Sequence, residues 1–157
     1  MISATQLHAM LVHFPIALLF AGFLSEIIGF FTRKTFFRQA GLYLLVLGAA
    51  GAAASYFSGN AAGDGMEEGA LGQAIALHEA AATRALVLVL IAAVVSVVLK
   101  IYKPDLRIGR IAAFLLFTAS IGAIAQTGYL GGQLVFKHGA GIELGADNFS
   151  GETPLNE

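Results

Sequence analysis

Four long apolar stretches alternate with polar connections along this chain of 157 residues. Each stretch has close to the twenty residues that an α-helix needs to cross the hydrocarbon core of a membrane. The pattern predicts membrane-spanning helices at about residues 9–31, 40–57, 80–99 and 111–135. We therefore expect an all-α fold, an integral membrane four-helix bundle, in which residues 1–157 form a single four-span domain.

The connections between the predicted spans differ in length and charge. Two of them, residues 32–38 and 100–110, are short and basic, and Pro104 in the second stops a helix. The central connection, residues 58–77, is the longest polar stretch before the tail. Because Lys and Arg in short loops tend to stay in the cytoplasm, we expect both termini and the central connection to be periplasmic in a bacterial inner membrane.

Pro15 interrupts the first apolar stretch, and a proline inside a helix removes one backbone hydrogen bond. The sequence leaves two alternatives open. Either the span starts near Phe14 with Pro15 in its first turn, or the helix is kinked at Pro15. Both alternatives predict that His13 lies at the membrane boundary, at the mouth of the first helix.

The composition agrees with a membrane protein and limits its chemistry. Hydrophobic residues make up 57% of the chain and charged residues 12%, and a soluble domain of this size could not bury so much apolar surface. The net charge of -1 gives no sign of nucleic-acid binding. The chain has no cysteine, which excludes disulfides, thiolate metal sites and covalent c-type haem attachment. Any metal or cofactor must therefore be held by nitrogen or oxygen ligands.

The chain has four histidines, and each of them adjoins a predicted span on the side expected to be periplasmic. A single histidine at a membrane boundary is most often an interfacial polar residue. Four on one face form a candidate ligand set for haem, copper, iron or zinc. His8 and His13 are five residues apart, so on one continuous helix they point roughly 140° away from each other. The candidate ligands are His8, His13, His78 and His138.

Small side chains are concentrated in the periplasmic halves of three predicted spans, at residues 48–55, 80–83 and 119–128. Two explanations remain open for this pattern. Small residues allow membrane helices to pack closely against each other. They would also leave space for a flat cofactor between helices that carry histidines.

Three further residues are candidates for contact with a cofactor. Arg84 could pair with a haem propionate, although an arginine at this depth could equally extend to the lipid headgroups. Gly131 and Gly132 would let a flat group approach the fourth span, although glycines also commonly end a helix.

Two motifs resemble those of a bacterial family of uncharacterised, predicted four-span membrane proteins. Residues 8–15 contain the motif HxxxxHFP, and residues 131–139 contain GGxLVxxHG. The chain has Ala9 where many relatives have proline and Phe136 where tyrosine is common, and neither difference removes a candidate ligand. Members of this family also occur joined to c-type cytochrome modules. The resemblance, which covers nearly the whole chain, therefore implies an association with periplasmic respiratory electron transfer.

The sequence supports three hypotheses about function. The first is a b-type haem protein that passes electrons near the periplasmic face, with some of the four histidines as axial ligands of haem b. The second is a membrane protein that binds a copper, iron or zinc ion through the same histidines. The third is a structural subunit of a respiratory complex. The expected partners are the lipid bilayer and either a periplasmic c-type cytochrome or respiratory complex subunits, and the small residues favour haem because a bare ion needs no cavity.

Overall fold

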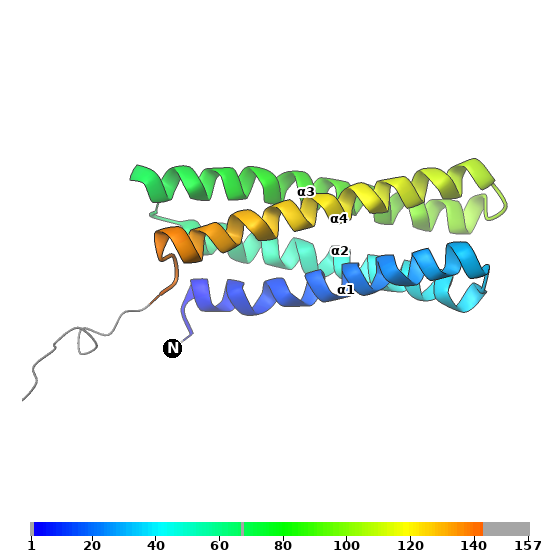
Figure 1. The fold of residues 1–157 in the computed structure, drawn as a ribbon, viewed down its shortest axis with the longest axis horizontal. Coiled ribbons are helices and arrows are strands. Elements are labelled where there is room, and N and C mark those ends of the chain that lie inside the picture. Colours follow the sequence, from blue (N-terminus) through cyan, green and yellow to red (C-terminus); the bar gives the residue numbers. More distant parts are fainter. Residues whose placement is uncertain (1, 67, 143–157) are drawn as a thin grey trace, which may run out of the picture.

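The computed structural model describes residues 2–66 and 68–142, and these residues form four α-helices. Successive helices run in opposite directions, so the start of α1, the α2–α3 connection and the end of α4 share one end of the bundle (Figure 1). We call this the histidine end, and the opposite end, which holds the α1–α2 and α3–α4 turns, the basic end. The helices are α1 (Ala4–Thr32), α2 (Thr35–Gly63), α3 (Gly69–Tyr102) and α4 (Arg107–His138).

The helices confirm the predicted all-α fold, and each predicted span lies within one of them. All four are long and apolar enough to cross a membrane. They are also longer than predicted, with 29 residues in α1 and 34 in α3. A helix of 34 residues is about 51 Å long, whereas the hydrocarbon core of a bilayer is about 30 Å thick. The helices therefore have length to extend beyond the core at their ends.

The prediction that residues 58–77 form the central connection is wrong. α2 continues to Gly63, and α3 already begins at Gly69. Both extensions contain alanines, which favour helix, so a stretch of lower hydropathy next to a span need not be a loop. As a result, His78 lies nine residues after the start of α3 rather than at its mouth.

α1 begins at Ala4, which rules out the alternative that the first span starts near Phe14 with Pro15 in its first turn. A capping box fixes this start. The Ser3 hydroxyl accepts a hydrogen bond from the backbone N–H of Gln6 at 3.2 Å, and the Gln6 side chain accepts one from the Ser3 N–H at 3.1 Å. These bonds satisfy two of the N–H groups at the helix start that have no partner within the helix.

Pro15 consequently lies in the interior of α1, where it is buried against Gly51 of α2. A Cβ atom added to Gly51 would lie 3.3 Å from the Cβ of Pro15, which leaves no spare room between the two helices at this level. His13 is therefore a residue of the helix body, nine positions after Ala4, and not a residue of the helix mouth.

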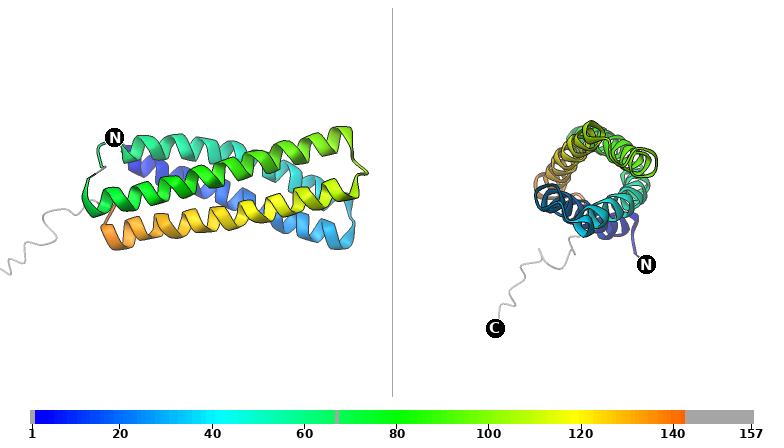
Figure 2. Two further views of the ribbon diagram at one scale, coloured as in Figure 1. Left: turned by 90° about the horizontal axis from the view of Figure 1, so that it is seen from above. Right: turned by 90° about the vertical axis from the view of Figure 1, so that its right-hand side faces the viewer.

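The four helices surround a common long axis and form two hairpins (Figure 2). α1 packs closely on α2, and α3 packs closely on α4, whereas α1 and α4 have the fewest contacts of the neighbouring pairs. Glycines allow the close approach of α1 and α2: a Cβ atom on Gly41 would lie 3.2 Å from the carbonyl oxygen of Gly22. Close packing therefore accounts for the small residues between α1 and α2.

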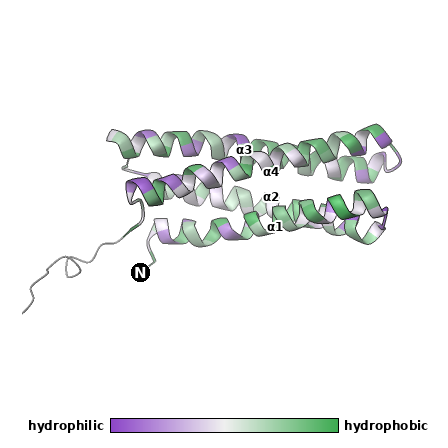
Figure 3. Ribbon diagram, in the orientation of Figure 1, coloured by the Kyte–Doolittle hydropathy of each residue, from purple (hydrophilic) through white to green (hydrophobic). Residues whose placement is uncertain are grey.

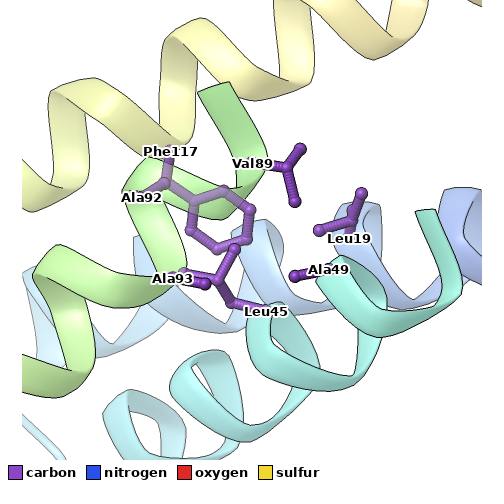
Figure 4. Packing of buried hydrophobic residues seen from close by; sticks show 7 residues of the cluster. All are labelled: Leu19, Leu45, Ala49, Val89, Ala92, Ala93 and Phe117. Atoms are coloured by element: carbon purple, nitrogen blue, oxygen red, sulfur yellow. The ribbon is translucent and has the colours of Figure 1, made fainter. Parts of the chain in front are cut away.

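Side chains from all four helices meet in an apolar core near the middle of the bundle (Figure 4). Leu19 and Val89 are fully buried there, and the ring of Phe117 on α4 points into the same cluster. Phe23 of α1 adds an edge-on contact with the ring of Phe117, with the ring centres 5.4 Å apart. The remaining members of the core are Leu45, Ala49, Ala92 and Ala93.

Apolar residues predominate along all four helices (Figure 3). Large hydrophobic side chains such as Leu24, Leu47, Val94 and Leu115 are exposed there. A soluble protein does not expose so many large apolar side chains in one continuous belt. This surface is therefore the one that contacts the lipid bilayer.

Candidate functional site

His8 lies on the face of α1 that packs against α2 near the histidine end. Its Nδ1 is 3.0 Å from the hydroxyl oxygen of Ser58, and that hydroxyl donates its own proton to the carbonyl oxygen of Ser55 at 2.9 Å. The Ser58 oxygen therefore accepts a hydrogen bond from the Nδ1–H of His8. The imidazole rests on Gly59, where an added Cβ atom would lie 2.9 Å from its Cε1.

His78 has the same kind of environment in the second hairpin. Its Nδ1 lies 3.1 Å from the backbone carbonyl oxygen of Thr127 on α4. A carbonyl oxygen can only accept, so Nδ1 carries the proton and donates this hydrogen bond. The imidazole rests on Gly131, where an added Cβ atom would lie 3.1 Å from its Cε1.

The two half-buried imidazoles are thus arranged alike, one in each hairpin. In both, a partner helix holds Nδ1–H, so the lone pair of the neutral ring is on Nε2. A hydrogen bond that fixes Nδ1 and leaves Nε2 as the ligand atom is the usual support of histidines that bind metals. His8 and His78 therefore share the tautomer and the supporting hydrogen bond that ligating histidines have.

The other two histidines are exposed and lie apart from this pair. The Nδ1 of His13 donates a hydrogen bond to the carbonyl oxygen of Ala9 at 2.7 Å, within the same helix. His8 faces α2 while His13 is exposed, as expected from their five-residue separation on one continuous helix. His138 is the last residue of α4, which Gly139 ends in a left-handed conformation with φ of 67°.

The remaining predicted contact residues also divide into two groups. Gly131 supports the imidazole of His78, as described above, whereas an atom added to Gly132 would meet nothing within 4 Å. Arg84 is exposed on α3. The structure therefore brings Gly131 to the histidine pair and leaves Gly132 next to open space.

The interior next to the histidine pair is built from small side chains. Three buried alanines lie between the histidine end and the apolar core, namely Ala52, Ala81 and Ala85. Ser55, one turn from Gly59, is also buried, and its hydroxyl has no hydrogen-bond partner among the described residues. A buried hydroxyl without a partner is costly, so this position suits a bound polar group or an ordered water.

A separate cavity of about 540 Å³ lies between α2 and α3 at the same end. Its polar lining includes Tyr56, Asn60, Glu79 and Thr83, and none of the four histidines belongs to it. The Thr83 hydroxyl lies 3.2 Å from the Tyr56 hydroxyl and bridges the two helices. Glu79 therefore faces this cavity, although it is next to His78 in the sequence.

Within residues 2–66 and 68–142, no group of three or more His, Asp or Glu side chains is arranged to hold a metal ion. A compact structural or catalytic metal centre uses at least three protein ligands. The described side chains alone do not supply such a ligand set.

A family model described as "Predicted membrane protein (DUF2231)" matches residues 4–144. The chain belongs to this family. No curated protein and no solved structure matches the chain. The matched range covers all four helices of this DUF2231 member. Membership confirms the resemblance to an uncharacterised family of membrane proteins that the two motifs predicted.

The residues that support the two imidazoles of this DUF2231 member are not evident from its sequence. They are Ser58, Gly59 and Thr127, in addition to Gly131. Their signal in the sequence is weak, because a serine, a glycine or a threonine near a helix end has many other uses. Only the register between the helices of each hairpin identifies them.

Proposed function

We propose that this protein is a membrane b-type haem protein that transfers electrons near the periplasmic face of the bacterial inner membrane, with His8 and His78 as axial ligands. The main support for the proposal is that the two imidazoles have the same burial and the same hydrogen-bonding arrangement. Each is half-buried, each has its Nδ1–H bonded to a partner helix, and each leaves Nε2 free as a ligand atom.

The residues around the pair fit such a cofactor. Gly59 and Gly131 leave room for the imidazoles, because a side chain at either position would contact the ring. The neighbouring buried side chains are small, so few atoms would have to move to admit a flat group. The unpartnered hydroxyl of Ser55 offers a donor to a polar edge. Bound haem supplies reversible one-electron exchange at its iron.

The chain itself contributes orientation and exclusion of water. Ser58 and the Thr127 carbonyl fix the tautomer and the direction of the two rings, which keeps Nε2 unprotonated and available. The apolar core around Leu19 and Phe117 closes the site toward the basic end. A site closed in this way shields the oxidised and reduced states from bulk water, which influences the redox potential.

The exposed histidines have a different role in this proposal. His13 and His138 lie outside the pair, on surfaces open to a second haem or a partner protein. A periplasmic c-type cytochrome or a respiratory complex subunit would meet the protein at the histidine end. Arg84, also exposed, is available to a propionate or to lipid headgroups.

The proposed orientation in the membrane rests on the distribution of Lys and Arg residues between the two ends of the bundle. Most of the Lys and Arg residues lie in or next to the two turns at that end, which favours a cytoplasmic location for it. The histidine end and both termini are then periplasmic, on the side where periplasmic electron carriers operate.

The absorption spectrum of the purified full-length protein, produced with ample haem supply, tests the proposal. We expect a Soret band and a sharp α band on reduction, typical of haem held by two histidines. His8→Ala and His78→Ala should each remove haem or convert it to a five-coordinate high-spin form, whereas the exposed control His138→Ala should leave the bis-histidine spectrum of this pair intact. Absence of haem, combined with stoichiometric copper, iron or zinc, would instead support the metal-ion hypothesis. Absence of both would leave the role of a respiratory complex subunit.

A further inference from the structure

A second cavity lies at the basic end, far along the helices from the histidine pair. Its volume is about 280 Å³, close to the lower limit of the volumes typical of small-molecule sites. All four helices and the α3–α4 turn contribute to its lining. We call it the basic cavity.

The charges that line the basic cavity are unbalanced. Four basic side chains face two acidic ones, Glu26 and Asp105, which leaves an excess of two positive charges. The basic side chains come from three separate segments, namely α2, the α3 end with its turn, and α4. They are Arg38, Lys100, Lys103 and Arg110.

These four cations line one cavity, and the usual enrichment of basic residues in cytoplasmic loops does not explain that arrangement. Retention of a loop in the cytoplasm needs Lys and Arg near the helix ends but not around a shared cavity. Arg33, Lys34 and Arg107 fulfil that requirement at the same end without lining the cavity. Arg38, in contrast, is half-buried, with its Cγ 2.6 Å from where a Cβ atom of Gly29 would lie. The first part of its side chain is therefore packed against α1, next to the cavity that Arg38 lines.

Two helix starts add to the positive potential. α2 and α4 both begin at this end, no side chain caps either of them, and neither has an acidic residue in its first turn. Helix N-termini normally attract acidic groups, because their free N–H groups point outward. Here Thr35 and Arg38 of the first turn of α2 line the cavity. Cations next to a helix N-terminus repel the helix dipole unless an anion lies between them.

The floor of the basic cavity is apolar, which favours an anion that also has an apolar part. Leu45 and Phe117, two members of the buried core, line it together with Phe114. A cavity with a cationic rim and an apolar floor at the membrane boundary matches an amphiphile with an anionic head. We propose that the basic cavity binds the phosphate group of an anionic phospholipid of the surrounding leaflet.

This site is independent of the proposed haem function and can be tested separately from it. The purified full-length protein is placed in nanodiscs of phosphatidylcholine, with or without phosphatidylglycerol, and phosphatidylglycerol retention is measured by native mass spectrometry alongside the melting temperature. We expect phosphatidylglycerol to be retained selectively and to raise the melting temperature. No preference over phosphatidylcholine would overturn the proposal.

Matched double variants distinguish a built site from general surface charge. Lys100→Gln with Arg110→Gln removes two cations of the cavity, whereas Lys34→Gln with Arg107→Gln removes one lysine and one arginine at the same end outside it. A cation close to an anionic lipid phosphate contributes about fivefold in affinity, and this contribution falls off within a Debye length. Because both cations of the cavity variant lie at the proposed phosphate site and the control cations lie outside it, the cavity variant should bind phosphatidylglycerol roughly 25-fold more weakly. The control should retain most of the affinity. Equal losses in both variants would contradict the proposal.

A single-substitution variant and a control with inorganic phosphate complete the test. Lys103→Gln, in the α3–α4 turn rather than in a helix, repeats the comparison with a single substitution if the double variant loses helical structure by circular dichroism. Inorganic phosphate added to the protein in pure phosphatidylcholine distinguishes a lipid headgroup from a soluble anion. Stabilisation by inorganic phosphate equal to that by phosphatidylglycerol, and lost in the cavity variant, would overturn the assignment to a lipid.

Discussion

The imidazole of His8 lies directly on the backbone of Gly59, since a Cβ atom at this glycine would be 2.9 Å from the Cε1 of the ring. His78 and Gly131 repeat the relationship in the second hairpin at 3.1 Å. In each hairpin, a histidine from the first helix thus occupies space that a glycine of the second helix leaves free. This space is what allows both rings to stay half-buried while their Nδ1 atoms reach a partner.

Gly59→Leu should therefore expel the His8 ring from its position and lower haem content about tenfold, because overpacking costs about 1–3 kcal/mol. The ratio of Soret absorbance to protein absorbance of the purified variant measures this loss. Gly128→Leu is the matched control, since nothing lies within 4 Å of a Cβ atom at that glycine. Equal losses in the two variants would show that leucine destabilises the bundle generally rather than displacing an imidazole.

Ser58→Ala removes the side chain that accepts the Nδ1–H of His8 and leaves the imidazole itself in place. Loss of such a supporting hydrogen bond typically weakens metal–ligand affinity by about 10- to 100-fold, so haem should still bind but dissociate faster. Transfer of haem to apomyoglobin gives the dissociation rate. Thr118→Ala, which removes a hydroxyl bonded only to the carbonyl of Phe114 in its own helix, should leave that rate unchanged. An unchanged rate in Ser58→Ala would argue against His8 as a ligand.

The topology predicts which fusion sites are exported. Reporters inserted after Gly65 or after Gly141 should give an exported signal, and reporters at Lys34 or Pro104 a cytoplasmic one, because basic residues are concentrated in the two turns at the basic end. Alkaline phosphatase and green fluorescent protein fusions measure the two outcomes in the same strain. An exported signal from Lys34 would reverse the orientation and remove the periplasmic location of the histidine pair.

The apolar stretches were sufficient to predict four spanning helices, because hydropathy over twenty residues is the dominant signal in a membrane. The helix ends were not predictable in the same way. Residues 58–63 and 69–77 are helical but less apolar, and hydropathy alone cannot distinguish a helix near the membrane surface from a loop. The start of α1 is an exception, because Ser3 and Gln6 have the spacing of a capping box, which indicates a helix that begins at Ala4.

The candidate site was predictable in its histidines but not in its pairing. Four histidines near one end of the bundle follow from topology and charge alone. That His8 and His78 are half-buried while His13 and His138 are exposed depends on which helix each residue faces. This orientation is set by contacts such as Gly22 with Gly41, and a single sequence does not reveal the register of two packed helices.

The sparse contact between α1 and α4 has a consequence for how the protein holds together. His8 belongs to one hairpin and His78 to the other, so any group bound by both would tie the hairpins to each other. Binding and docking of the hairpins are then thermodynamically linked, and the free energy of ligation adds to the resistance of the bundle against separation along this seam. A group held by both histidines would therefore add a connection between the hairpins, which pack only sparsely where α1 meets α4.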